Sequence, residues 1–104
     1  LTKRMILYDG KNLKINDTII YFYANWMPQH LRMMKVIKNL NEYQYNVLVV
    51  DVDSFKDFTK ANNITCVPTF IFFKNKKQVD KIEGMQLSSV IHNKIYEIYV
   101  KDKS

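Results

Sequence analysis

The chain has 104 residues, of which 47% are hydrophobic and 25% charged, a composition typical of one globular domain. No run approaches the ~20 apolar residues that a membrane span requires, so we expect no membrane partner. The net charge is +6, but the lysines are scattered and form no stripe with interleaved aromatic residues. We therefore expect a solvated basic surface and no nucleic-acid partner.

Cysteine content and the first residue bear on the origin of the chain. Cys66 is the single cysteine, so the chain cannot close an intrachain disulfide. A lone cysteine favours a reducing compartment such as the cytoplasm. We expect one domain over residues 1–104, which can be a piece excised from a longer protein because the chain begins with Leu1.

Five strands are predicted by short runs of β-branched and aromatic residues. They cover residues 5–8, 18–24, 46–52, 69–73 and 78–83. The second and third runs show no polar alternation, which indicates strands buried on both faces of a sheet. The turn dipeptide Asp9-Gly10 ends the first run, and Gly84 ends the last.

Three helices are predicted around these strands. Pro28 suits the first turn of a helix whose inner face carries Leu31, Met34 (with Met33), Ile37 and Leu40. A short second helix has Ser54 and Asp57 as a capping box, with Phe55, Phe58 and Ala61 facing inward and Asn62-Asn63 as its stop. The last helix presents Leu87, Ile91, Ile95 and Ile98 on one face.

The order of these elements predicts the fold class. A strand, a helix and a strand in succession imply a parallel pair with a right-handed crossover. The short connection before residues 78–83 implies an antiparallel pair. We therefore predict an α/β protein with a central mixed sheet between two layers of helices.

Several short motifs resemble the thioredoxin family at that family's spacing over residues 18–100. They are Ala24-Asn25-Trp26, Val50-Asp51-Val52-Asp53, Val67-Pro68-Thr69 and Gly84. The resemblance implies a thioredoxin fold in which Pro68 is cis and its loop lies beside the turn that follows Trp26. It also implies a flat groove that pairs with the extended backbone of a substrate. Because residues 9–17 are short and polar, we expect the first helix of the family to be missing or shortened.

The turn after Trp26 departs from the family pattern. Family members read Trp-Cys-Gly-Pro-Cys there, whereas this chain has Met27 and His30 at the cysteine positions, with Pro28 and Gln29 between them. A thioether has no proton to lose, and an imidazole cannot resolve a mixed disulfide. We therefore expect no two-cysteine redox chemistry and no catalytic residue at these vestigial positions.

Three further substitutions agree with that interpretation. The resemblance places Tyr21 where redox members bury an aspartate, Val49 where a lysine often pairs with it, and Lys35 where a proline kinks the helix. Without a thiolate to serve, a buried carboxylate would cost desolvation energy, and a large aromatic ring can fill its space.

Two residues could still supply chemistry. Cys66 is a candidate reactive thiol, and the competing interpretation is an inert cysteine without a basic neighbour in the local sequence. His30 in the first helical turn could bind a metal together with Cys66, but two ligands are fewer than the three or four such sites use. We therefore expect no metal and no cofactor.

Our leading hypothesis is a protein-binding module without disulfide reductase activity. Its partner-binding surface would comprise Trp26, Met27, Pro28, Val67 and Pro68. The alternatives are a single-cysteine thiol protein acting through Cys66, and a splicing-associated thioredoxin-like protein, for which the basic charge is the argument. We expect a monomer, or a dimer through Cys66 under oxidising conditions.

Overall fold

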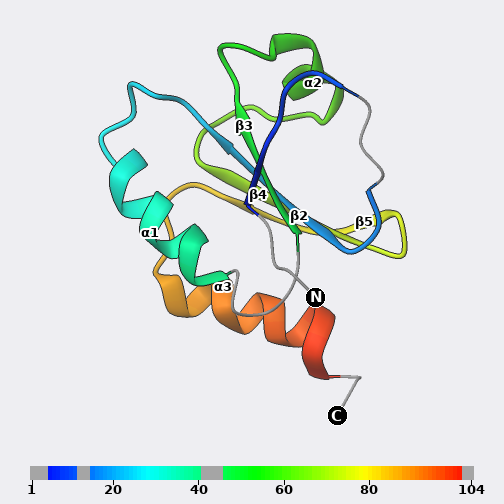
Figure 1. Ribbon diagram of the computed structural model, residues 1–104. Helices are drawn as coiled ribbons and strands as arrows, with labels where there is room; N and C mark the ends of the chain where they lie inside the picture. The colour runs from blue at the N-terminus through cyan, green and yellow to red at the C-terminus, as the bar shows by residue number, and fades with distance from the viewer. Residues whose placement is uncertain (1–4, 12–14, 41–45, 102–104) are drawn as a thin grey trace.

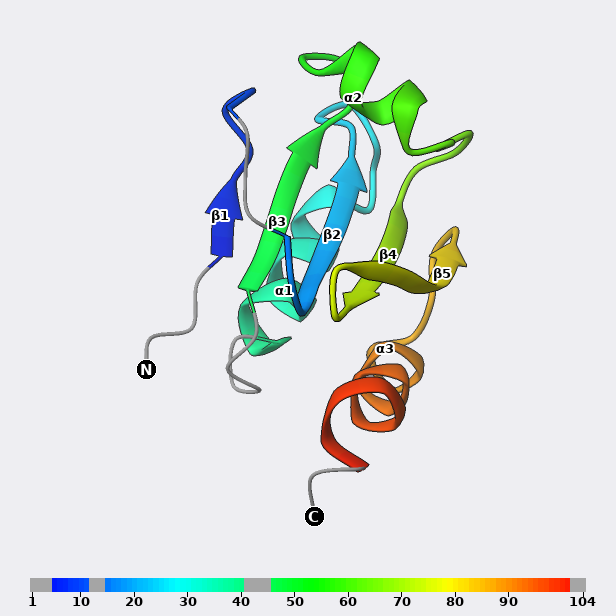
Figure 2. The same ribbon diagram turned by 90° about the vertical axis from the view of Figure 1, so that its right-hand side faces the viewer.

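The computed structural model describes residues 5–11, 15–40 and 46–101 of the chain. Its strands form one five-stranded sheet in the order β1-β3-β2-β4-β5 (Figures 1 and 2). The strands are β1 (Met5–Leu7), β2 (Thr18–Tyr23), β3 (Asn46–Asp51), β4 (Thr69–Lys74) and β5 (Lys77–Glu83). β3 is parallel to β1 and β2, whereas β4 is antiparallel to β2 and β5 to β4. The predicted mixed sheet is confirmed.

The central strands are buried on both faces, as their unbroken apolar runs predicted. Side chains alternate across a strand. On β2, Ile19 and Tyr21 therefore belong to one core cluster, and Ile20 and Phe22 belong to the other. All four side chains are fully buried.

The first face is covered by α1 (His30–Leu40), α3 (Ser88–Ile95) and the π-helical turn η2 (Tyr96–Val100) that continues α3 (Figure 1). Ile91, Ile95 and Tyr99 recur every four residues along this C-terminal segment and are buried. The Tyr99 hydroxyl donates a hydrogen bond of 2.7 Å to the Phe73 carbonyl, which ties η2 to the end of β4.

The predicted inner face of α1 is confirmed at Met33 and Ile37, and Met34 packs against the core, but it is wrong at Leu31. Leu31 is 78% exposed, and Met33 takes the inner position beside Ile37. The helix begins at His30, whose ring stacks on Tyr23 with 4.5 Å between centroids. Residues 30, 33 and 37 share one side of the helix, so this contact and the buried Met33 and Ile37 lie on the same side. The side chain of Leu40, also predicted to face inward, lies outside the described residues.

The second face is covered by α2 (Lys56–Ala61) and by the segment after β1. Tyr8 stacks on Phe58 at 4.3 Å between ring centroids. The predicted capping box is absent, because Ser54 Oγ donates to Asp51 and Phe55 is the N-cap residue. Asn63, at φ 58°, ends this segment as predicted.

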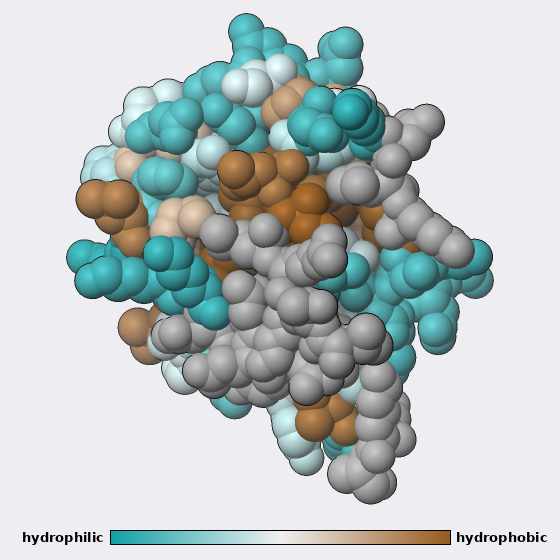
Figure 3. Space-filling model, viewed as in Figure 1, coloured by the Kyte–Doolittle hydropathy of each residue, from teal (hydrophilic) through white to brown (hydrophobic). Residues whose placement is uncertain are grey.

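Residues 9–11 and 15–17, the described residues of the segment predicted to lack the first helix, contain no helix. Within the described ranges, no helix is long and apolar enough to cross a membrane. Figure 3 shows hydrophilic residues over much of the described surface of one side, with apolar residues gathered near its centre below α2.

Candidate functional site

The candidate site lies at the carboxyl ends of β2 and β3. These strands are parallel neighbours, but the chain leaves β2 toward α1 on the first face and β3 toward α2 on the second. Divergence of this kind opens a crevice at the edge of an α/β sheet. The structure brings Trp26, Cys66 and Val67 to this crevice, so segments far apart in the sequence meet there.

Trp26 is held in an exposed position by a carboxylate from the turn after β3. Its indole Nε1 donates a hydrogen bond of 3.0 Å to Asp53 Oδ2, although 70% of the residue remains exposed. A large ring held open to solvent has its orientation fixed before any partner arrives, which lowers the entropic cost of binding.

Asp51 fixes the backbone around this ring. Its carboxylate accepts hydrogen bonds from Asn25 Nδ2 at 3.0 Å, from Ser54 Oγ at 3.2 Å and from the Asp53 N–H at 3.0 Å. These bonds join the turn after β2 to the turn after β3. The sequence singled out Asp51 and Asp53 only as members of a motif that resembles the family. The hydrogen bonds that their carboxylates accept could not be predicted from the sequence.

Met27 does not belong to the exposed surface on which the sequence placed it. The residue is 4% exposed and is part of the first core cluster. Its N–H donates to the Ala24 carbonyl at 3.1 Å, which closes the turn, and the side chain packs inward. Pro28 is exposed, Gln29 and His30 are half-buried, and Pro28 precedes the helix instead of lying in its first turn.

A stack of three aromatic rings lies beneath this turn. Tyr23 stacks on His30 at 4.5 Å and on Tyr21 at 5.7 Å between ring centroids. Tyr21 Oη and His30 Nδ1 are buried without a hydrogen-bond partner among the described residues. Burial, and secondarily the neighbouring Tyr23, raises the pKa of Tyr21, while burial and then the Asp51 charge raise the pKa of Tyr23. Both phenols therefore stay protonated near neutral pH.

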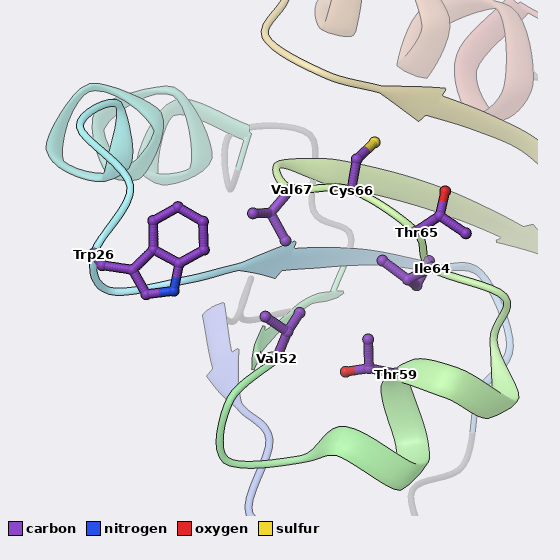
Figure 4. Close-up of a pocket in the computed structure, with 7 residues that line it drawn as sticks. All are labelled: Trp26, Val52, Thr59, Ile64, Thr65, Cys66 and Val67. Atoms are coloured by element: carbon purple, nitrogen blue, oxygen red, sulfur yellow. The ribbon is translucent and has the colours of Figure 1, made fainter.

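The loop before β4 forms the opposite wall. The Val67–Pro68 peptide bond is cis, Pro68 is buried and Val67 is half-buried. Cys66 is exposed, and in Figure 4 its sulfur points away from Trp26 and Val52. The Thr69 hydroxyl donates its proton to the Cys66 carbonyl at 2.7 Å, so it can only accept from the thiol, which lies 3.7 Å away.

Between these walls lies a hollow of about 440 Å³ (Figure 4). Its apolar lining comes from Trp26, Val52, Ile64 and Val67, and Thr59 and Thr65 add hydroxyl groups. Sequence reasoning missed Val52, Ile64 and Thr59. Of these, only Val52 gave a signal, because it follows Asp51, the last residue of β3, at the strand end that faces the crevice.

The described ranges contain no group of three or more histidine, cysteine, aspartate or glutamate side chains that could hold a metal ion. The crevice thus offers an aromatic ring, apolar walls and hydroxyl groups, with the exposed Cys66 at its rim and its sulfur directed away from Trp26. These groups suit recognition of an apolar side chain better than catalysis by a charged or metal-bound group.

Comparison with known proteins places these features in a family. The sequence model of the Thioredoxin family matches residues 8–97. Rice (Oryza sativa subsp. japonica) thioredoxin H4-2 is 49% identical over 83 residues, which cover 73% of this chain and 55% of that protein. Glutaredoxin 3 of Danio rerio is 32% identical over 76 residues, which cover 71% of this chain and 23% of that protein.

Solved structures agree with the sequence matches. A mutant thioredoxin from Halobacterium salinarum NRC-1 aligns with a TM-score of 0.75 at 27% identity, over 80% of this chain and 75% of that one. The chain spans about a fifth to a quarter of the glutaredoxin 3 relatives that it matches.

Proposed function

Since the chain belongs to the thioredoxin family and has its fold, we propose that it is a non-catalytic binding module. It holds an extended segment of another protein without a covalent bond, at the surface formed by Trp26, Pro28 and Val67. Because Met27 and Pro68 are buried, they support this surface from below.

The observation that carries the proposal is the exposed, fixed indole of Trp26 beside an apolar hollow. Large aromatic side chains beside such hollows are typical anchors of protein interfaces. The turn itself offers only a buried thioether and a half-buried imidazole where a redox member has thiols. A partner at this surface therefore has no sulfur in the turn to react with.

The backbone of Val67 supports the extended form of the partner. Its N–H and C=O form no hydrogen bond with a described residue, although the neighbouring Pro68 carbonyl is bonded to Gly84 N–H at 2.8 Å. Free main-chain groups next to a sheet can pair with a strand from another chain.

The exposure of Cys66 favours a second candidate function. Its thiolate could attack a client disulfide, forming a mixed disulfide and releasing one client thiolate. Because the chain has no second cysteine, an external thiol such as glutathione would have to resolve that bond. Under oxidising conditions the same thiol could join two copies, which a non-reducing gel would reveal.

Affinity capture under reducing conditions separates the two candidates. The binding module predicts that wild type and Cys66→Ser retain the same proteins, and that Trp26→Ala loses them. Val79→Ala is the matched control, because Val79 is an exposed apolar residue on β5 outside the hollow. Equal recovery by wild type and Trp26→Ala would contradict the binding surface. A parallel capture without reductant completes the test: proteins retained only there, and lost in Cys66→Ser, would favour the thiol protein.

A further inference from the structure

The hollow beside Trp26 continues into a second hollow of about 420 Å³ along α2. The two share Val52, Thr59, Ile64 and Thr65, so they form one continuous groove. One end is walled by Trp26 and Val67. The other end is lined by Lys56, Lys60 and Asn63. The groove therefore has an apolar aromatic end and a basic end.

The positive charges of Lys56 and Lys60 at the basic end are not paired with carboxylates of the described residues. Lys56 and Lys60 lie four residues apart on α2, so they share one side of the helix. Neither ammonium group forms an ion pair or hydrogen bond with another described residue. Lys81 approaches the same end, where its Nζ donates to the Asn63 carbonyl at 3.0 Å, although it also pairs with Glu83 at 3.3 Å.

The acidic residues near the groove, Asp51, Asp53 and Asp57, line neither of its two hollows. Asp53 accepts from the indole of Trp26, and Asp51 accepts from Asn25 and Ser54. Asp57 is exposed on α2 but does not line either hollow. A ligand that enters the basic end thus meets two cations without a competing carboxylate in the lining.

We propose that the groove selects an extended acidic peptide segment. An apolar side chain of the segment fills the hollow beside Trp26, and one or two carboxylates farther along pair with Lys56 and Lys60. This inference rests on the proposed function and names the class of partner that the site accepts. Charge complementarity of this kind gives specificity and faster association more than raw affinity.

A nucleic-acid strand fits the groove less well. Single-strand binding sites place successive aromatic rings along a basic track, so that neighbouring bases can stack. Trp26 is the one aromatic residue that lines either hollow in the described part of the chain. A peptide needs only one apolar anchor, which this lining supplies.

Trp26 provides the readout, because it is the single tryptophan of the chain and lines the groove. Its emission would be followed during titration with a short peptide that carries one leucine and, after a spacer, a pair of glutamates. Matched peptides carry glutamines or lysines in place of the glutamates. Wild type should bind the glutamate peptide more tightly than the glutamine peptide, and the difference should shrink as salt is added.

A charge-reversal pair locates the effect. Lys56→Glu/Lys60→Glu should weaken the glutamate peptide by about fivefold or more and favour the lysine peptide, since a pair of attractions becomes a pair of repulsions. The control is Lys35→Glu/Lys38→Glu, an equal charge change at exposed positions of α1 on the other face of the sheet. It should leave the preference for the glutamate peptide intact, and circular dichroism would show that both variants fold.

The other possible outcomes contradict different parts of the proposal. Equal binding of the glutamate and glutamine peptides, or equal weakening by the two double variants, overturns the acidic selectivity while the proposed binding surface stands. No change of Trp26 emission with any peptide overturns both. Tighter binding of a single-stranded oligonucleotide than of the glutamate peptide overturns the choice of a peptide as the occupant.

Discussion

Two segments at the same end of the sheet use their side chains in opposite ways. The turn at residues 27–30 places Met27 in the core and leaves His30 Nδ1 buried without a described partner. The loop at residues 65–68 keeps Cys66 exposed and Val67 half-buried beside the hollow. The family's reactive positions have thus become part of the packing, while the opposite wall of the crevice remains a surface.

The comparison teaches that binding and chemistry at such a site depend on different residues. The proposed recognition needs an exposed ring and an apolar wall, which Trp26 and Val67 would provide. Dithiol exchange needs two ionisable sulfurs at the turn, and Met27 and His30 provide none. A fold can therefore lose one capacity and keep the other.

Met27 packs in the core, so its truncation should destabilise the fold more than any other change considered. Met27→Ala should lower the free energy of unfolding by about 2–4 kcal/mol, because it leaves a cavity in a packed core. Leu31→Ala, at an exposed position of the adjoining helix, should change it by less than about 0.5 kcal/mol. Urea denaturation of both variants measures the contrast. Equal, small losses would mean that Met27 is a surface residue after all.

Two buried tyrosines differ in whether their hydroxyl groups have a hydrogen-bond partner among the described residues. Tyr99→Phe should cost about 1 kcal/mol, since the Tyr99 hydroxyl bonds to the Phe73 carbonyl. Tyr21→Phe should be neutral or stabilising, since the Tyr21 hydroxyl is buried beneath the turn with no partner in the described ranges. Thermal unfolding in parallel would compare them. A loss in Tyr21→Phe as large as that in Tyr99→Phe would show that the Tyr21 hydroxyl is satisfied.

A smaller effect concerns the exposed ring. Asp53→Ala removes the acceptor of the indole N–H and should lower stability by about 0.5–1 kcal/mol, while Trp26 becomes more mobile. Time-resolved fluorescence anisotropy of the single tryptophan should show faster local motion. Ser54→Ala, which removes a bond to Asp51 instead, is the control. Unchanged anisotropy in Asp53→Ala would mean that packing alone orients the ring.

The smallest effect comes from an ion pair outside both segments. Burial would raise the pKa of Asp80, but hydrogen bonds from Lys94, at 2.8 Å, and from the Lys81 N–H bring that pKa below its ordinary value. A depressed carboxyl pKa stabilises the fold above the unfolded value, and this contribution is lost as pH falls through the folded value. Because both side chains are partly exposed, we expect about 0.5 kcal/mol or less.

The contribution of the Asp80–Lys94 ion pair is checked by measuring the free energy of unfolding at decreasing pH. The measurements cover the acidic range in which carboxyl groups titrate. Wild type should lose slightly more stability on acidification than Asp80→Asn, and the difference should appear below about pH 4. A difference that persists unchanged across this range would show that the pair does not depend on the Asp80 charge.

Much of this architecture could be predicted because the strand signals are local. The apolar runs of β2 and β3 need no tertiary information to indicate burial on both faces. The exposure of Leu31 could not be predicted, because Leu31 and Met33 are both apolar and only tertiary contacts show which of them is buried. The burial of Met27 was also missed. The hydrogen bond from its N–H to the Ala24 carbonyl closes the turn, and the side chain packs into the core.

The hydrogen bond between Trp26 and Asp53 could not be predicted from the sequence either. Both residues stood out as members of motifs, but 27 positions separate them, and nothing local says that the indole would find that carboxylate. The predicted capping box failed in the other direction. Ser54 matched the local sequence pattern of a cap, but its hydroxyl donates a hydrogen bond to Asp51 instead. Tertiary contacts override local preference where the site is assembled.

We propose above that the surface around Trp26 binds a protein segment and that the turn after it exchanges no disulfides. An insulin-reduction assay on wild type and Cys66→Ser, with dithiothreitol background subtracted, tests it most directly. We expect no turnover above background from either protein. Turnover in wild type that vanishes in Cys66→Ser would identify a single-cysteine enzyme. Turnover that persists in Cys66→Ser would contradict the chemistry assigned to positions 27 and 30.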